Sequence, residues 1–289
     1  MELLLIKKGF NYSQDGTGNR LVYHLQGCNM RCPWCSNPEG IALKGTFLVN
    51  RDQLLEEVCP FGSIQNHSIN RVMCDSCQDR SCLNTRKNSG IHFSCQRVTI
   101  EDLVQEAIDC KALFFDGGGV TISGGEPTLQ FDALLALLKR LKQNGIHTAI
   151  ETNGSSPRLE ELFDYLDLLI MDFKHYDDQI HRQFTGISNQ VIQKNIGKAF
   201  AQHKNVWIRT PLIHNFNADL AFIPSFISFY HKFDTSNASF ELLKYHEYGV
   251  SKWKQCDLPY TMQDGNITQE LLETFEQAYQ ENNLRVIRT

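Results

Sequence analysis

Three cysteines in one short run are the residues of this chain most suited to chemistry. Cys28, Cys32 and Cys35 follow the spacing C-x3-C-x2-C within GCNMRCPWC. Three thiolates can hold three irons of a four-iron, four-sulfur cluster, whereas ordinary electron-transfer clusters of this type use four cysteines. The fourth iron then keeps an open coordination position. An open position suggests chemistry on a bound small molecule, as it does at catalytic zinc sites.

Two plainer interpretations of these cysteines are a zinc ribbon and a set of buried thiols. A zinc ribbon usually needs a second ligand pair at a matched spacing. The triad instead lies in a loop directly after an apolar run, with Trp34 immediately before the last cysteine. This context favours an iron–sulfur cluster.

The composition limits the other classes of function. The chain has 289 residues, 42% of them apolar, and a net charge of −5. That length suits one large domain or two small ones, and the charge gives no sign of nucleic-acid binding. No apolar stretch is long enough to span a bilayer. The apolar part of the N-terminal MELLLIKKGF is too short for a signal peptide, so this segment is predicted to be an edge strand. We expect a cytoplasmic protein without membrane contact.

The cysteines are clustered rather than scattered. Eight of the ten lie between Cys28 and Cys95, and only Cys110 and Cys256 lie outside. In a reducing compartment, such a cluster indicates metal ligands or catalytic thiols rather than a disulfide framework. The two outlying cysteines have no motif around them and are interpreted as small buried hydrophobes.

Short apolar runs alternate with helical patterns along most of the chain. Strands are predicted at 21–26, 119–123, 147–151, 168–171, 206–209 and 240–245, and helices at 99–109, 132–144, 189–202, 219–232 and 269–281. Repeated strand–helix units imply a parallel sheet. Six units are too few for a closed eight-fold barrel. The predicted fold is therefore α/β, an open and partial (β/α)6 barrel that resembles part of a TIM barrel.

One segment interrupts this alternation. Residues 46–96 are polar and hold five cysteines. We interpret them as a small inserted domain between the first barrel strand and its helix. The barrel itself would then consist of residues 1–45 and 97–289.

The cysteine triad, with an aromatic residue before its last member, resembles the radical S-adenosylmethionine (SAM) superfamily. Further motifs resemble the activating enzymes of glycyl-radical enzymes, of which the pyruvate formate-lyase activating enzyme is the best-known relative. These motifs are DGTGNR at 15–20, LQGCNMRCPWCSNPEG at 25–40, TISGGEPTLQ at 121–130, ETNG at 151–154, MDFKH at 171–175, TGISN at 185–189, IRTPLI at 208–213 and KYHEYG at 244–249. Most follow a predicted strand, at the end that carries the active site in α/β barrels.

The resemblance implies a [4Fe-4S] cluster on the cysteine triad, with SAM chelating the open iron. One-electron cleavage of SAM would give a 5′-deoxyadenosyl radical, with the cofactors supplying the chemistry and the protein supplying position and electrostatics. The glycines of the GGE turn allow close approach of the backbone to the ligand. Glu126 would accept hydrogen bonds from the methionine amino group, and Lys174 and Arg209 would pair with its carboxylate. The residues expected to bind SAM are Trp34, Asn37, Gly124, Gly125, Glu126, Thr152, Asp172, Lys174, Arg209 and His246.

Three of these assignments have open alternatives. Glu151, Thr152 and Asp172 resemble residues that hold a monovalent cation beside SAM, a role that oxygen ligands suit. His246 is equally well a satisfied structural histidine, and Trp34 could belong to the core. Asp15 and Gly16 resemble the segment near the substrate glycine loop.

The insert resembles a ferredoxin-like module that has lost part of its cysteines. Ferredoxin runs follow C-x2-C-x2-C-x3-C-P, and the fourth cysteine of each run ligates the other cluster. CPFGSI at 59–64 resembles the tail of a first run, and a second run loses its last cysteine to Arg86. One auxiliary [4Fe-4S] cluster is therefore predicted, and a four-cysteine zinc site is the alternative. Its ligands would be Cys59, Cys74, Cys77 and Cys82, with Cys95 as a substitute for one of them.

The resemblance predicts an enzyme that abstracts hydrogen from one glycine of a partner glycyl-radical enzyme. Its electron donor would be a flavodoxin or a ferredoxin, and nucleic acids and membranes are not expected as partners. A radical SAM enzyme acting on a small molecule or a peptide is the main alternative. A non-catalytic module with zinc in both cysteine groups is the second.

Overall fold

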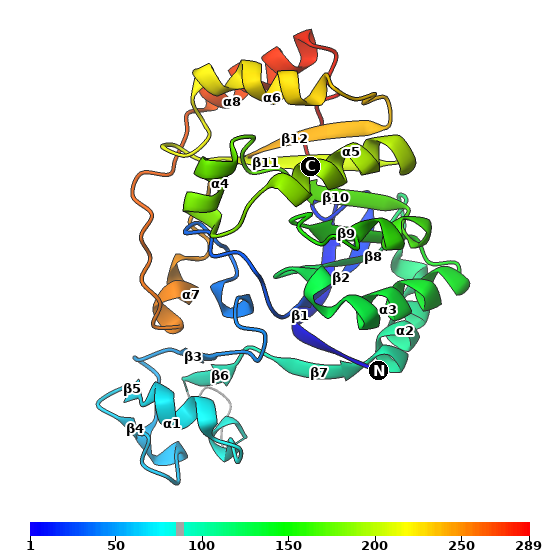
Figure 1. The fold of residues 1–289 in the computed structure, drawn as a ribbon. Helices are drawn as coiled ribbons and strands as arrows, with labels where there is room; N and C mark the ends of the chain where they lie inside the picture. Colours follow the sequence, from blue (N-terminus) through cyan, green and yellow to red (C-terminus); the bar gives the residue numbers. More distant parts are fainter. Residues whose placement is uncertain (85–89) are drawn as a thin grey trace.

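An eight-stranded sheet forms the centre of the computed structural model, which describes residues 1–84 and 90–289 (Figure 1). The strand order is β12-β11-β10-β9-β8-β2-β1-β7. The six strands from β12 to β2 pair in parallel, and β1 and β7 extend the sheet in antiparallel fashion. The bounds are β1 Glu2–Tyr12, β2 Asn19–Leu25, β7 Gln96–Thr99, β8 Gly119–Gly124, β9 Thr148–Thr152, β10 Leu168–Asp172, β11 Val206–Leu212 and β12 Ala238–Lys244.

Helices cover one face of this sheet and bury the main hydrophobic core against it. They are α2 Ile100–Asp109, α3 Phe131–Gln143, α5 Gln190–Gln202, α6 Ile223–Tyr230 and α8 Gln269–Glu281. The parallel strands are buried along almost their whole length, as expected for a sheet that alternates with helices in sequence. All six predicted parallel strands and all five predicted helices are present, and the sheet is consistent with an open, partial barrel.

Local signals explain where several helices begin. Thr99 accepts a hydrogen bond from the backbone N–H of Asp102 at 3.1 Å, as the capping pattern TIED predicts. The helix predicted at 219–232 begins later, because Leu220–Phe222 form a 3-10 turn before Pro224 starts α6. Helix α4 (Asp178–Thr185) was not predicted, and its buried residues are His181 and Thr185.

The N-terminal strand does not lie at the edge of the sheet, and the edge-strand prediction is wrong. Residues 2–5 of β1 pair with β7, which follows the insert, with Leu3 opposite Val98. The edge position therefore belongs to β7. Because β7 is only four residues long, its pairing partner could not be identified from the local pattern.

The predicted insert has a small core of its own and projects from the barrel (Figure 1). It contains β3 Phe47–Val49, β4 Ile64–Gln65, β5 Ser68–Ile69, α1 Arg71–Ser76 and β6 Ile91–Phe93. Antiparallel pairing of β3 with β6 closes the segment at its base. Arg86, which replaces a cysteine of the ferredoxin pattern, lies outside the described residues. These two-stranded pieces do not by themselves establish a ferredoxin-like fold.

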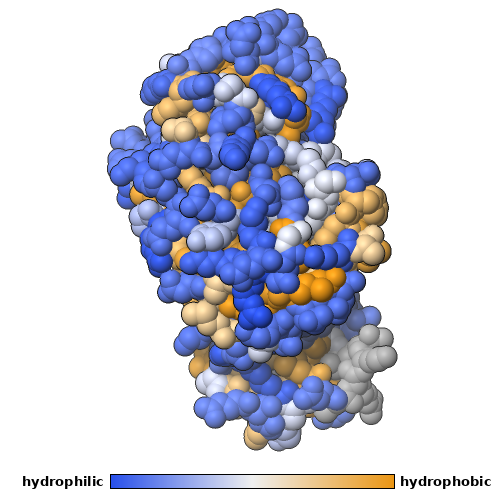
Figure 2. Space-filling view, turned by 90° about the vertical axis from the view of Figure 1, so that its right-hand side faces the viewer, coloured by the Kyte–Doolittle hydropathy of each residue, from blue (hydrophilic) through white to orange (hydrophobic). Residues whose placement is uncertain are grey.

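The face of the molecule at the right-hand side of Figure 1 is largely hydrophilic, with apolar side chains in separate patches (Figure 2). Among the described residues, no helix is long and apolar enough to cross a membrane.

Candidate functional site

A cavity of about 540 Å³ lies at the carboxyl ends of the parallel strands, where the cysteine loop follows β2. Loops from six strands reach it, as the positions of the sequence motifs predict. Eleven of the predicted site residues line it: Cys28, Cys32, Trp34, Cys35, Asn37, Gly124, Gly125, Asp172, Lys174, Arg209 and His246.

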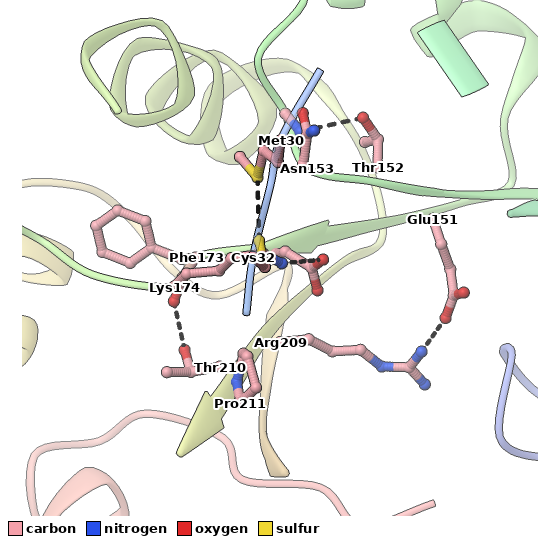
Figure 3. Close-up of polar contacts among 12 residues, drawn as sticks. Met30, Cys32, Glu151, Thr152, Asn153, Phe173, Lys174, Arg209, Thr210 and Pro211 are labelled. Carbon is pink, nitrogen blue, oxygen red and sulfur yellow. Dashed lines mark hydrogen bonds and ion pairs between the residues drawn. The ribbon is translucent and has the colours of Figure 1, made fainter. Parts of the chain in front are cut away.

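The three cysteines of the triad are free thiols on the wall of this cavity. The Sγ of Cys32 is buried and lies 4.0 Å from the Met30 Sδ (Figure 3). Burial raises the pKa of Cys28 to about 11 and that of Cys32 to about 12, because it disfavours the thiolate. A positive group is therefore needed to hold these sulfurs as thiolates.

The donor set fits an iron–sulfur cluster better than a single metal ion. In residues 1–84 and 90–289, no three His, Cys, Asp or Glu side chains are grouped so as to hold one ion. A zinc ion draws its sulfur ligands to about 2.3 Å, whereas a four-iron cluster spreads its thiolates around a larger inorganic core. Three thiols around one side of a large cavity match the second arrangement.

The GGE turn closes tightly against the cysteine loop. A side chain at Gly125 would place its Cβ 2.1 Å from the carbonyl oxygen of Gly27, so only glycine fits. Gly124 has φ +116°, a conformation that favours glycine. The backbone N–H of Glu126 donates to the Gly27 carbonyl at 2.7 Å. The turn therefore exposes backbone, rather than side chains, to the cavity.

Glu126 does not reach the cavity in this structure, which corrects the predicted contact with the ligand amino group. Its carboxylate is fully buried and accepts four hydrogen bonds. The donors are the N–H and hydroxyl of Thr128, the hydroxyl of Thr152 and the N–H of Asn153. Three of these bonds go to Oε1 and one to Oε2, and the side chain is not part of the cavity lining. Glu126 instead joins the turn after β8 to the end of β9, and Thr152 is occupied in the same network.

Lys174 lies on the wall of the cavity. Its ammonium lies 2.6 Å from the Asp172 carboxylate, and the side chain is 8% exposed (Figure 3). Burial opposes its charge, but Asp172 and the nearby Cys32 thiol more than compensate, so the pKa of Lys174 is raised. The site thus holds a permanent cation at the cysteines.

Arg209 lines the cavity, but its guanidinium is already engaged. It donates to the Glu241 carboxylate at 2.6 Å, and it also contacts the Glu151 carboxylate and the Gln14 carbonyl (Figure 3). Together they use one N–H on each of the three guanidinium nitrogens, in the group that the resemblance assigned to a ligand carboxylate. In this structure Arg209, on β11, links Glu241 of the adjacent β12 to Glu151 of β9, which lies two strands away.

The oxygens predicted to hold a monovalent cation are committed to other partners. Glu151 binds Arg209 and accepts from Ser123, Thr152 donates to Glu126, and Asp172 binds Lys174. Burial raises the pKa of Glu151 to about 7, although Arg209 opposes this effect.

Trp34, Asn37 and His246, which are predicted to bind SAM, also line the cavity. Trp34 packs on Phe216 with ring centroids 4.6 Å apart and is half-buried. His246 is exposed and stacks on Tyr248 at 4.3 Å. Both residues line the cavity and also contact a neighbouring aromatic side chain. A ligand contact and a structural role are therefore both compatible with their positions.

Sequence reasoning missed several lining residues. Asn153 belongs to the ETNG motif, in which the preceding Thr152 was predicted to be a site residue and Asn153 was not. Gln14 enters from the β1–β2 turn, next to Asp15, whose carbonyl accepts from Thr121 at 2.7 Å. The remaining unassigned residues are Met30, Ser36, Pro211, Ile213, Leu243, Lys244, Tyr245, Tyr248 and Thr289. Apolar and C-terminal residues of this kind carry no chemical signal in the sequence.

A second, much smaller cavity of about 20 Å³ lies in the insert. Cys59, Cys74, Cys77 and Cys82 all line it, together with Phe61 and Arg80. Cys95 does not line it and instead lies against Gly45. The four cysteines named from the ferredoxin spacing are therefore brought together, and the substitute is not.

Comparison with known proteins agrees with this geometry. The radical SAM superfamily model matches residues 22–221. The chain belongs to the radical SAM superfamily. It is 30% identical, over 93% of its length and 90% of the relative's, to the 4-hydroxyphenylacetate decarboxylase activating enzyme of Clostridioides difficile. It is 32% identical to the isethionate sulfite-lyase activating enzyme of Nitratidesulfovibrio vulgaris, over 91% of this chain and 90% of the relative.

Solved structures give the same result for this radical SAM protein. A domain of a pyruvate-formate lyase-activating enzyme from Bacteroides vulgatus aligns with a TM-score of 0.50 and 30% identity. It covers 59% of this chain and 98% of that domain. Streptococcus suis SuiB shares the fold, with a TM-score of 0.56 at 16% identity over 92% of this chain and 47% of SuiB. Within the superfamily, the chain is therefore one of the activating enzymes of glycyl-radical enzymes.

Proposed function

We propose that this activating enzyme holds a [4Fe-4S] cluster on Cys28, Cys32 and Cys35 and binds SAM in the 540 Å³ cavity. It then abstracts a hydrogen from the α-carbon of one glycine in a partner glycyl-radical enzyme. The observation that best supports this proposal is that three free thiols, the Gly124–Gly125 turn and the Lys174 cation all line one cavity.

The residues of the chain have distinct tasks in this proposal. When bound, the cluster and SAM supply one-electron chemistry that yields a carbon-centred radical. Lys174 holds the ligand carboxylate by charge, and the tight GGE turn offers backbone groups to the amino group. Trp34 and Asn37 contact the nucleoside. Arg209, held by Glu151 and Glu241, fixes its part of the cavity wall.

Four cysteines around the small insert cavity support an auxiliary [4Fe-4S] cluster. Their grouping matches the ferredoxin-like spacing, and no described trio is close enough for a single ion. We propose that this cluster passes electrons from a flavodoxin or a ferredoxin. A four-cysteine zinc staple remains the competing assignment, because the pair Cys74 and Cys77 is also a zinc half-site.

A test of the proposed function measures the product radical directly. Anaerobically reconstituted protein is reduced, mixed with SAM and a candidate glycyl-radical enzyme, and examined by electron paramagnetic resonance (EPR). A glycyl doublet on the partner, absent from a partner variant whose glycine is replaced by alanine, is the expected result. SAM cleavage without any partner radical, across the partners of the three related activating enzymes named above, would argue for a small-molecule or peptide substrate instead.

A further inference from the structure

A short C-terminal segment joins the two cysteine-bearing parts of the molecule. Residues 249–257, which we call the strut, comprise α7 (Val250–Gln255) and its flanking residues. The strut lies between the cysteine loop and the base of the insert, beside β3 (Figure 1). Apart from Gly249, the last residue of KYHEYG, it contains no motif residue and no predicted ligand, and it is not part of the sheet.

On one side, the strut binds the backbone of the cluster loop. The indole Nε1–H of Trp253 donates to the Cys35 carbonyl at 2.9 Å, and Trp253 is 7% exposed. A side chain at Gly249 would place its Cβ 2.5 Å from the same carbonyl oxygen and 2.9 Å from the Ser36 Cα. Glycine therefore allows the strut to approach this loop closely. The carbonyl of a ligand cysteine is thus fixed by a side chain far away in sequence.

Lys252 makes a second set of contacts to the same loop. Its ammonium donates to the Ser36 carbonyl at 2.9 Å and to the Asn37 side-chain oxygen at 2.7 Å. It also pairs with the buried Glu39 carboxylate at 2.8 Å. Asn37 is a predicted nucleoside contact, so the strut sets the orientation of that side chain as well.

On its other side, the strut binds the insert. The Asp257 carboxylate accepts from Arg71 at 2.9 Å and from Arg51 at 2.8 Å. Arg71 also donates to the Gln255 carbonyl at 3.0 Å and to the Phe47 carbonyl at 2.7 Å. Arg71 is the first residue of α1, the helix that carries Cys74 and ends at Cys77. The strut therefore holds the helix of the second cysteine group by its N-terminus.

We propose that the strut sets the position of the SAM-binding cysteine loop relative to the insert, with Trp253 and Asp257 as positioning residues. Trp253 acts on Cys35 through its carbonyl, and Asp257 acts on α1 through Arg71. The contact of Trp253 with Cys35, which we call the first arm of the proposal, depends only on the cluster of the triad. The arm towards the insert rests on the proposed auxiliary cluster.

The Trp253→Phe variant tests the first arm, because it keeps an aromatic ring at this position and removes the N–H donor together with the five-membered ring of the indole. SAM affinity and the SAM-induced change in the EPR spectrum of the reduced cluster are measured on reconstituted protein. We expect full iron content, an altered spectral change and SAM binding weakened about fivefold, as for one lost hydrogen bond. Arg158→Ala, which removes an exposed ion pair with Glu161, is the matched control. Unchanged affinity and spectrum in Trp253→Phe would overturn this arm.

A double-mutant cycle tests the arm towards the insert. Cys77→Ala and Asp257→Asn are made singly and together, and the SAM dissociation constant is measured for each. If the strut transmits the state of the insert, each single change weakens binding several-fold and the double variant is no weaker than the worse single. Additive effects, or no effect of either change, would overturn the coupling. The iron count of Cys77→Ala separately reports whether the auxiliary cluster exists, and Trp253→Phe tests the strut in either case.

Discussion

The Lys174 ammonium lies 2.6 Å from the Asp172 carboxylate, and both side chains line the wall of the large cavity that holds the cysteine triad. Asp172 ends β10 and Lys174 lies two residues further, so alternation along the extended chain points both to one side. The pair presents a fixed positive charge with an adjacent negative one. That arrangement suits a zwitterionic ligand, and the amino and carboxylate groups of the SAM methionine form one.

Replacing Lys174 with alanine should weaken SAM binding by tenfold or more, since charge-assisted hydrogen bonds contribute about 1.5–3 kcal/mol. The dissociation constant can be measured by equilibrium dialysis on the reconstituted protein. Lys198→Ala, which removes a surface pair with Glu160, is a suitable control because it lies far from the cavity. An equal dissociation constant for Lys174→Ala and Lys198→Ala would remove Lys174 from the binding site.

Replacing Cys32 with alanine should remove the cluster of the triad and abolish SAM cleavage. Two thiolates cannot hold a four-iron cluster as three do, and Cys32 is the most buried of the three. Iron content and 5′-deoxyadenosine formation are the two measurements. Cys110→Ala, which changes a cysteine outside both groups, should leave both values unaltered. Continued 5′-deoxyadenosine formation by Cys32→Ala would contradict the cluster assignment.

Replacing Glu126 with glutamine distinguishes the predicted role from the observed one. The buried carboxylate accepts four hydrogen bonds, and an amide would turn one acceptor into a donor facing an N–H or hydroxyl. We expect the free energy of unfolding to fall by about 1–3 kcal/mol, with a smaller effect on SAM affinity than Lys174→Ala has. The two values come from denaturant titration and dialysis. Weaker SAM binding at unchanged stability would restore the direct contact.

The sequence located most of the site because its signals are local. The cysteine spacing and the charged residues after apolar runs are visible without the fold, and eleven predicted residues do line the cavity. The engagement of Arg209 was not predictable, because its partners Glu151 and Glu241 come from other strands, β9 and β12, that are far away in sequence. The same reason hid the strut: Trp253 meets Cys35 across 218 residues, and α7 is a short helix without a motif. The strand at the edge of the sheet could not be predicted, because it depends on the pairing of β1 with β7, which are far apart in sequence.

Replacing Cys77 with alanine should remove about four irons and leave those of the triad. Cys77 lines the small insert cavity with three other cysteines, whereas Cys95 does not. Cys95→Ala should therefore retain the full iron content and is the matched control. Metal analysis with sulfide determination separates the outcomes. Zinc instead of iron in the insert of the wild-type protein would identify a structural zinc site. Equal iron losses in Cys77→Ala and Cys95→Ala would show that Cys95 is also a ligand.

Glu151 should make the stability of the cluster-free protein depend on pH. Burial raises its pKa from 4.5 to about 7, with Arg209 opposing the shift and Asp15 and Asp172 adding to it. Between these two values the folded protein holds a proton that the unfolded chain has released, so this contribution to stability falls as the pH rises. Its slope is at most about 1.4 kcal/mol per pH unit. Glu151→Gln removes the contribution, and its stability relative to the wild type should therefore increase from pH 5 to pH 7. Urea titrations of both proteins at the two pH values measure this difference, and parallel pH profiles would show that Glu151 ionises normally in the folded state.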